Sequence, residues 1–357
     1  MLKDRSGRIR PLLEHCALDG LVFLDPANLA YLSGFSGTDG VLIVTRSASC
    51  FLTDSRYTTQ AREEVTASEV GEYADKVTGV LDWLRKSGIS RVGFEAATLP
   101  YATAMRFREG APGLEWVPLD KELKPLRGSK DAGEVNALGR AAALNSAALA
   151  EVLPRLTPGV SERNFALELE FALKRRGGEE KAFDFIVASG RRGAMPHGVA
   201  SDKLLAAGEL VTIDFGTRVD GYHSDETVTL ALGAIEEDQR RVFDTVLAAH
   251  DRAIAGIRPG VPLRSIDALA RGYIDDQGFG EFFGHGLGHG VGREVHEFPV
   301  VSPRSETIAE EGMVFTVEPG VYLPGVCGVR IEDMVVVTAD GCRVLTQIPK
   351  HFRSLPV

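Results

Sequence analysis

Long apolar runs and paired cysteines are both missing from this chain. A membrane-spanning helix needs roughly 18 or more consecutive apolar residues, and no stretch of the sequence approaches that length. The first ten residues, MLKDRSGRIR, contain no apolar core of the kind a signal peptide carries, so we expect none. The four cysteines show no CxxC spacing, which predicts reduced thiols in a cytoplasmic protein. They are Cys16, Cys50, Cys327 and Cys342.

Basic residues are too few and too scattered for general nucleic-acid binding. The 40 Lys and Arg are outnumbered by 50 Asp and Glu, which gives a formal net charge of −10. We therefore expect neither nucleic acid nor a membrane as a partner. What the chain does have is the composition of an ordinary globular protein, 44% hydrophobic and 25% charged. Its 357 residues suggest two domains, since one core rarely grows beyond about 250–300 residues.

The predicted elements divide the chain into two domains, 1–125 and 126–357. The first domain alternates short apolar runs with helical patterns, which is typical of an α/β fold. Its predicted strands are 21–24, 41–45, 50–53 and 91–95, and its predicted helices are 58–65 and 77–86. In the second domain a long helix is predicted over 134–153, and another begins after the cap residue Ser161. Two more helices are predicted over 236–257 and 265–277.

Acidic residues embedded in apolar strands are the most informative feature of the second domain. Asp214 lies in VTIDFG, Asp225 in HSDETVTL, Glu318 in VFTVEPG and Glu332 in VRIEDMVVV. A buried ionised carboxylate is unfavourable unless a cation neutralises it, and these segments contain no Lys. Together with His289 in the loop GHGLGHGVG, the four acids indicate divalent cations.

The four acids fall into two predicted hairpins of similar design. A two-residue turn near residues 219 and 220 would place Asp214 and Asp225 about opposite each other, with Cβ atoms ~4.5–5.5 Å apart. Glu318 and Glu332 repeat the arrangement across a longer connection that contains Gly and Pro. Two such hairpins facing one another would form a cage for metal ions. The alternative is two solvated hairpins, although like charges placed so close bring no structural benefit.

The glycine-rich segment 283–292 carries His285 and His289 at a spacing that resembles a zinc-binding helix. Five alternating glycines disfavour a helix by roughly 1 kcal/mol each, and the glutamate of an HExxH motif is absent. The glycines do not match a dinucleotide-binding loop either. An extended chain places both rings on one side, so one could bind metal while the other faces substrate. His197 in MPHG and His296 in EVHEFP are further functional candidates. The remaining histidines are interpreted as surface or partly packed residues, namely His15, His223, His250 and His351.

Five ordered motifs of the second domain resemble those of the Xaa-Pro peptidases, prolidase and aminopeptidase P, within the pita-bread metallopeptidases. The motifs are PHG, IDFG with SDETVT, HGLGHGVGREVHE, TVEPGVY and VRIED. In the first domain PANLAYLSGFSG, LTDSRYTTQA and VGFE contribute, and LRGSKDAGEVNALGRAA lies at the junction. The resemblance covers almost the whole chain. It implies an α/β N-terminal domain of the creatinase/prolidase type followed by an α+β pita-bread catalytic domain.

The resemblance also implies a role for each candidate residue. The ligands of two divalent ions would be Asp214, Asp225, His289, Glu318 and Glu332. The residues lining the substrate site would be His197, His285 and His296. Asp225 and Glu332 would bridge the ions, and Glu318 would handle the proton of the attacking water. Mn²⁺ is the expected ion because the ligands are mostly oxygen atoms, with Co²⁺ or Zn²⁺ as alternatives.

The reaction implied by the resemblance is hydrolysis of the bond between an N-terminal residue and a following proline by a metal-bridged hydroxide. The implied partners are short proline-containing peptides and a second copy of the chain in a homodimer. The residues themselves do not specify the oligomeric state or the preferred peptide length.

The chain departs from the common family pattern at three positions. Val228 replaces a frequent Arg, and Arg293 stands where Leu is more common. Val300 stands where archaeal prolidases carry an Arg thought to bind the dipeptide carboxylate, so prolidase and aminopeptidase P both stay open. Creatinase is disfavoured because it lacks this metal set, and methionine aminopeptidase because it lacks such an N-terminal domain. A non-enzymatic relative is disfavoured because no ligand is lost here.

Overall fold

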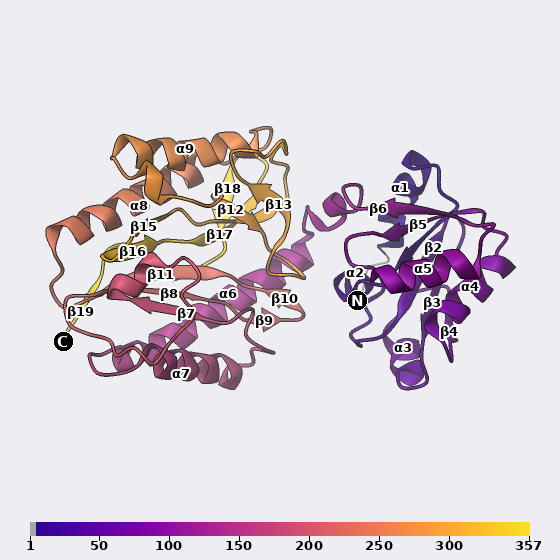
Figure 1. Cartoon of the computed structure of the whole chain (residues 1–357), viewed down its shortest axis with the longest axis horizontal. Coiled ribbons are helices and arrows are strands. Elements are labelled where there is room, and N and C mark those ends of the chain that lie inside the picture. Colours follow the sequence, from indigo (N-terminus) through magenta and orange to yellow (C-terminus); the bar gives the residue numbers. More distant parts are fainter. Residues whose placement is uncertain (1–4) are drawn as a thin grey trace. The chain divides into compact units, whose positions relative to one another are not determined.

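The structure is a computed structural model, and residues 5–357 of the chain are described. The chain separates between Leu126 and Arg127 into two compact units, the N-terminal unit and the C-terminal unit (Figure 1). None of the helices formed by residues 5–357 combines the length and the apolar character needed to span a membrane.

The N-terminal unit is a six-stranded mixed sheet with helices on both faces. The strand order is β4-β3-β2-β1-β5-β6, and β2 runs antiparallel to both of its neighbours. Alternate residues of β1 face opposite sides, so Leu21 and Phe23 enter one apolar core and Val22 enters the other. The strands are β1 (Gly20–Phe23), β2 (Val41–Thr45), β3 (Ser49–Thr53), β4 (Glu69–Glu72), β5 (Arg91–Glu95) and β6 (Glu115–Leu119). The helices are α1 (Arg10–His15), α2 (Pro26–Ser33), α3 (Thr58–Glu64), α4 (Lys76–Lys86) and α5 (Tyr101–Gly110).

The strands and helices predicted for this unit are all present close to their expected bounds. The elements that were not predicted are α1, α2, α5, β4 and β6. Two of them, α5 and β6, were missed for different reasons. Only Phe107 of α5 is buried, so the helix has little amphipathic signal. Strand β6 contains Pro118, which cannot donate to a sheet but is tolerated here because β6 lies at the sheet edge.

The C-terminal unit places two sheets between two pairs of helices (Figure 1). One sheet has the order β19-β11-β8-β7 and packs against α6 and α7. The other has the order β13-β12-β14-β17-β18 and packs against α8 and α9. The helices are α6 (Ala132–Val152), α7 (Glu162–Arg175), α8 (Glu237–Ala255) and α9 (Leu263–Asp276), and Ser161 caps α7 as predicted. The strands of the first sheet are β7 (Ile186–Ser189), β8 (Leu210–Phe215), β11 (Glu226–Leu232) and β19 (Ser354–Leu355). The strands of the second sheet are β12 (Gly288–Gly290), β13 (Glu297–Val301), β14 (Val314–Val317), β17 (Asp333–Val337) and β18 (Cys342–Val344). Two short hairpins lie outside these sheets. One joins β9 (Arg218–Val219) to β10 (Tyr222–His223), and the other joins β15 (Gly320–Leu323) to β16 (Cys327–Arg330).

The first acidic hairpin turns one residue later than predicted, and its register differs. Strands β8 and β11 pair Asp214 with Thr227, so Asp225 lies diagonally across from Asp214 rather than opposite it. Asp220 and Gly221 form the turn, with positive φ angles of 50° and 71°. These angles suit a two-residue hairpin turn, in which Asp-Gly is favoured. The prediction of directly opposed aspartates was therefore wrong, although both side chains still belong to one face of the sheet.

The second acidic hairpin has the predicted register. Val317 of β14 pairs with Asp333 of β17, and the same alignment continues in the pairing of β15 with β16. Glu318 and Glu332 lie between these two strand pairs. They therefore face each other across the hairpin.

The glycine-rich histidine loop is extended rather than helical, as predicted, and forms β12. A Cβ on Gly288 would lie 1.9 Å from the carbonyl oxygen of Thr316, and one on Gly290 would lie 2.3 Å from that of Phe298. Neighbouring strands approach too closely for any side chain at these two positions. The glycines therefore let the backbone on either side of His289 lie close against both flanking strands.

Candidate metal centre

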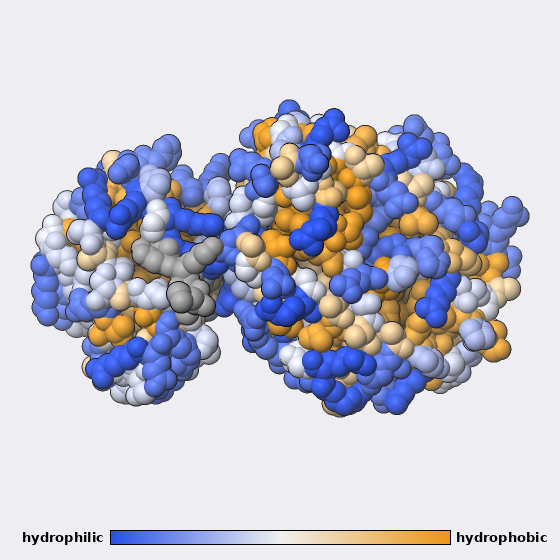
Figure 2. Space-filling view, turned by 180° about the vertical axis from the view of Figure 1, so that it is seen from behind, coloured by the Kyte–Doolittle hydropathy of each residue, from blue (hydrophilic) through white to orange (hydrophobic). Residues whose placement is uncertain are grey.

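All eight residues predicted for the site line one cavity of about 910 Å³ in the C-terminal unit. They are His197, Asp214, Asp225, His285, His289, His296, Glu318 and Glu332. The rest of the lining is mostly apolar, and includes Ile186, Val199, Val300 and Pro324. The space-filling view likewise shows patches of hydrophobic surface on this unit amid hydrophilic side chains (Figure 2). A cavity of this size and character suits a small organic ligand.

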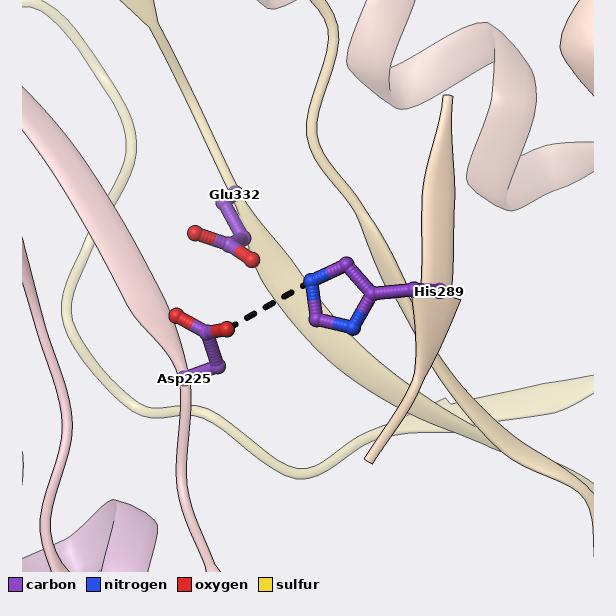
Figure 3. A group of neighbouring side chains, drawn as sticks. All are labelled: Asp225, His289 and Glu332. Carbon is purple, nitrogen blue, oxygen red and sulfur yellow. Dashed lines mark ion pairs between the residues drawn. The ribbon is translucent and has the colours of Figure 1, made fainter. Parts of the chain in front are cut away.

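Asp225, His289 and Glu332 form the centre of the cluster. One ligand atom from each lies within 4.8 Å of the other two, and the three side chains converge from separate parts of the unit (Figure 3). The Nε2 atom of His289 lies 3.6 Å from Oδ2 of Asp225 and 3.2 Å from Oε1 of Glu318. Thr316 orients Glu318 by donating its hydroxyl to the same Oε1 atom at 3.0 Å.

Burial and neighbouring charges shift the pKa values of three acids in this cluster. Burial, followed by the charges of Glu332, Asp214 and Glu318, raises the pKa of Asp225 well above its usual value. Burial and the charges of Glu318 and Asp214 do the same for the pKa of Glu332. Burial also opposes the ionisation of Glu318, but its hydrogen bond with His289 and nearby positive charges lower that pKa to about 2. Full ionisation of the cluster needs additional positive charge, which divalent ions supply.

One carboxylate oxygen of Asp214 has a hydrogen-bond partner, and the other has none among the described residues. Its Oδ2 atom accepts a hydrogen bond from Nη2 of Arg330 at 2.5 Å. Its Oδ1 atom is buried and has no hydrogen-bond partner among the described residues. A buried oxygen without a partner is unfavourable, so the residues present fit a divalent ion that would bind there.

The three histidines without a metal role in the prediction lie around the same cavity. His285 contacts the hydroxyl of Tyr322 through Nε2 at 2.9 Å, and burial lowers its pKa. His296 has its ring 4.1 Å from that of His289, and burial followed by the charge of His289 lowers its pKa. His197 is exposed and lines the cavity as well. The lowered pKa values of His285 and His296 favour their neutral forms.

Two functional candidates were missed by the sequence analysis, Arg330 and Tyr322. Both line the cavity, and Nη1 of Arg330 donates to the Tyr322 hydroxyl at 3.0 Å. The acidic segments contain no Lys, but the segment of Glu332 contains Arg330, and this arginine provides a cation for Asp214. Arg330 lies two residues before Glu332, and this spacing on a strand puts both side chains on one face. That spacing in the sequence could have identified Arg330 as a residue of the site.

The three departures from the family pattern have separate surroundings. Val228 is 3% exposed and packs in the core beside α6 and α7. Arg293 donates to the carbonyl oxygen of Asp220 at 3.0 Å and so braces the turn of the first acidic hairpin. Val300 is 53% exposed and lines the cavity. Only Val300 is therefore placed to contact a substrate.

A buried set of carboxylates with one imidazole, lining a cavity that suits a small organic ligand, is the arrangement expected of a metal-dependent hydrolase. The chain belongs to metallopeptidase family M24, which residues 136–339 match, and residues 5–128 match the creatinase/prolidase N-terminal domain. This assignment confirms the predicted fold class and the prediction of a metal-dependent peptidase, because the matched family is one of metallopeptidases.

Relatives cover nearly the whole chain. A Xaa-Pro dipeptidase of Pyrococcus furiosus is 35% identical over 98% of this chain and 100% of its own length. The structure of a Xaa-Pro dipeptidase from Bacillus anthracis has a TM-score of 0.95 at 39% identity, covering 98% of this chain and 99% of that one. The structure of an X-Pro aminopeptidase from Thermotoga maritima has a TM-score of 0.91 at 35% identity, covering 99% and 100%.

Proposed function

We propose that the protein hydrolyses the bond between an N-terminal residue and a following proline in short peptides, using two divalent ions. The observation that carries this proposal is the buried acid cluster, with the unpartnered Oδ1 atom of Asp214 at its edge. The names of relatives that cover the whole chain support the proline preference.

In this proposal five residues hold the ions: Asp214, Asp225, His289, Glu318 and Glu332. Asp225 and Glu332, at the centre of the cluster, would serve both ions, and Mn²⁺ would suit the oxygen-rich set, with Co²⁺ or Zn²⁺ as alternatives. When bound, such ions lower the pKa of a water molecule and polarise the scissile carbonyl. Glu318 accepts the proton of the attacking water, held in place by the Thr316 hydroxyl.

The remaining cavity residues bind and orient the peptide. His296 would donate to the peptide carbonyl, while His285, whose Nδ1 and Nε2 atoms contact the carbonyl oxygen of Gly286 and the Tyr322 hydroxyl, shapes the wall beside it. His197 closes the site from the exposed side. A prolyl nitrogen carries no hydrogen, so the site needs no acceptor at that atom. The apolar part of the lining accommodates the pyrrolidine ring.

The preferred length of the substrate peptide depends on whether the site offers a cation to the peptide's terminal carboxylate. Among the cavity-lining residues of the C-terminal unit, Arg330 is the single Lys or Arg. Its guanidinium group already donates to Asp214, Tyr322, Thr227 and the carbonyl oxygen of Pro196. A dipeptide would place its carboxylate beside the site without a free cation from this lining. This favours peptides longer than two residues, the substrates of an aminopeptidase P.

The decisive experiment compares substrates with purified protein and Mn²⁺. Xaa-Pro dipeptides, Xaa-Pro-Yaa tripeptides and Xaa-Ala-Yaa tripeptides are assayed side by side. We expect the proline tripeptides to be cleaved fastest and the alanine tripeptides to be almost inert. Equal turnover of the alanine peptides would contradict the proposal. The homodimer and the cytoplasmic location stay predictions, which sedimentation velocity and cell fractionation would test.

A further inference from the structure

A second buried ionic cluster lies behind the candidate metal centre. Each of the two acids proposed to be shared by both ions is followed directly by another buried acid. Asp225 precedes Glu226 and Glu332 precedes Asp333, and these following acids are 0% and 7% exposed. Successive residues of a strand point to opposite faces, so Glu226 and Asp333 point away from the metal centre.

Lys350 joins these two acids. Its Nζ atom lies 2.7 Å from Oε1 of Glu226 and 3.2 Å from Oδ1 of Asp333, and its side chain is 8% exposed. The same C-terminal segment adds the backbone N–H of Ile348, which donates to Oε1 of Glu226 at 3.1 Å. The hydroxyl of Thr346 donates to Oδ1 of Asp333. A short segment near the end of the chain therefore ties together the starts of β11 and β17.

His250 of α8 completes the cluster. It was predicted to be a surface or partly packed residue, but it is 2% exposed, and its Nε2 atom lies 3.2 Å from Oδ2 of Asp333. Lys350 contacts an acid on each of the two strands, whereas His250 contacts Asp333 and, through Nδ1, its helix neighbour Asp251. Lys350 is therefore the residue of this cluster that links the two acids, in addition to the direct hydrogen bond from the Thr227 hydroxyl to Oε2 of Glu332 at 2.6 Å.

We propose that Lys350 is a positioning residue for the metal centre, holding β11 and β17 at the spacing that lets Asp225 and Glu332 share the same ions. The inference rests on the two-ion site proposed above. Without the ammonium group, Glu226 and Asp333 would be two buried carboxylates that repel each other across the strands. The direct backbone link between the strands at this level, Glu332 N to Thr227 O, is 3.2 Å long.

The sign of the effect on ion binding separates positioning from simple electrostatics. Lys350 is positively charged, so by Coulomb's law alone its removal would strengthen the binding of a nearby cation. If its main contribution is geometric, its removal weakens the binding of the ion that needs both shared acids. The two interpretations therefore predict changes in opposite directions.

The test measures stepwise Mn²⁺ binding to metal-free protein by calorimetry, together with the electron paramagnetic resonance spectrum of the two-ion form. Lys350→Met is expected to weaken the second ion by ~10-fold or more, in line with other residues that orient ligands. It should also diminish the spectroscopic coupling between the ions. The double variant Lys350→Met, Glu226→Gln removes the repulsion as well, so it is expected to recover most of the affinity. Lys203→Met is the matched control, because Lys203 pairs with Glu209 and neither residue lines the cavity.

Each outcome decides one question. If Lys350→Met binds both ions as tightly as the wild type, or more tightly, the positioning role is overturned. If the wild type itself binds no second ion, the two-ion site fails, and this failure is visible before any variant is made. If Lys350→Met does not fold, Glu226→Gln alone is used, since it keeps the buried cation. It should weaken the second ion by a smaller factor, and unchanged affinity there would also overturn the inference.

Discussion

Arg330 and Asp214 form a buried ion pair, with Nη2 of the arginine 2.5 Å from Oδ2 of the aspartate. The pair lies on the wall of the cavity, and it uses only one oxygen atom of the carboxylate. Further donations from Arg330 to Tyr322 and Thr227 fix the plane of the guanidinium group. Asp214 is therefore held in one orientation before any ion binds.

This orientation predicts a strong effect of Arg330→Lys. The variant keeps the positive charge, but a single ammonium group cannot make the planar set of contacts to Asp214, Tyr322 and Thr227. We expect kcat/KM to fall by roughly 10–100-fold, with weaker metal binding. Arg163→Lys is the control, because Arg163 pairs with Asp202 on the exposed surface. Full activity in Arg330→Lys would show that charge alone is sufficient.

Removal of metal should abolish the activity. We expect protein dialysed against a chelator to be inactive and to recover when Mn²⁺ is added. Asp225→Ala should lose both the activity and the bound ions, because this acid is shared by the two ions in the proposed site. Metal analysis and a peptidase assay on the same samples check this, with the exposed Asp202→Ala as control. Activity in demonstrably metal-free protein would contradict the proposed function.

His296→Ala should separate catalysis from metal binding. The ring of His296 lies tilted against that of His289, but His296 is not among the five proposed ligands. We expect kcat to fall by roughly 10²-fold or more, with a metal content close to that of the wild type. His15→Ala, on the surface of the N-terminal unit, should change neither quantity. Parallel loss of metal and activity in His296→Ala would instead make this residue a ligand.

Val300→Arg should shift the preference toward dipeptides. Val300 lines the cavity and is about half exposed, so a longer side chain can enter without disturbing the core. A guanidinium group there can pair with the carboxylate of a dipeptide. We expect kcat/KM for Xaa-Pro dipeptides to rise about 10-fold, which corresponds to one charge-assisted hydrogen bond. Val326→Arg, equally exposed but outside the cavity, is the control. No gain in Val300→Arg would place the carboxylate elsewhere.

Gly221→Ala tests the turn that sets the register of the first acidic hairpin. Gly221 has a φ of 71°, and a Cβ there would lie 2.4 Å from Nη1 of Arg293. Left-handed backbone destabilises a residue with a side chain by roughly 1–2 kcal/mol, and the contact with Arg293 adds to this. Gly325→Ala is the matched control, because Gly325 has a φ of 75° and open space around it. Denaturant unfolding should show the larger loss of stability in Gly221→Ala, and equal losses would remove any role for Arg293.

The two acidic hairpins show how far local sequence could predict the register. In the second hairpin the turn is long, yet strand pairing on both sides of Glu318 and Glu332 keeps them aligned. In the first hairpin the prediction centred the turn one residue too early. The observed pairing of β8 with β11 therefore differs from the predicted pairing by two residues. The Asp220-Gly221 dipeptide was a sufficient signal for the correct turn, because both residues tolerate positive φ.

By itself, the sequence determined the chemistry of the protein and most of its local structure. Acids within apolar strands require cations wherever those strands pack, and helical or alternating patterns depend on neighbours a few residues away. Only the tertiary structure decided which charges meet. Arg330 and Asp214 are 116 residues apart, and Lys350 and Glu226 are 124 apart. Contacts of this range depend on how two sheets and a C-terminal segment pack together, and no local pattern specifies that packing.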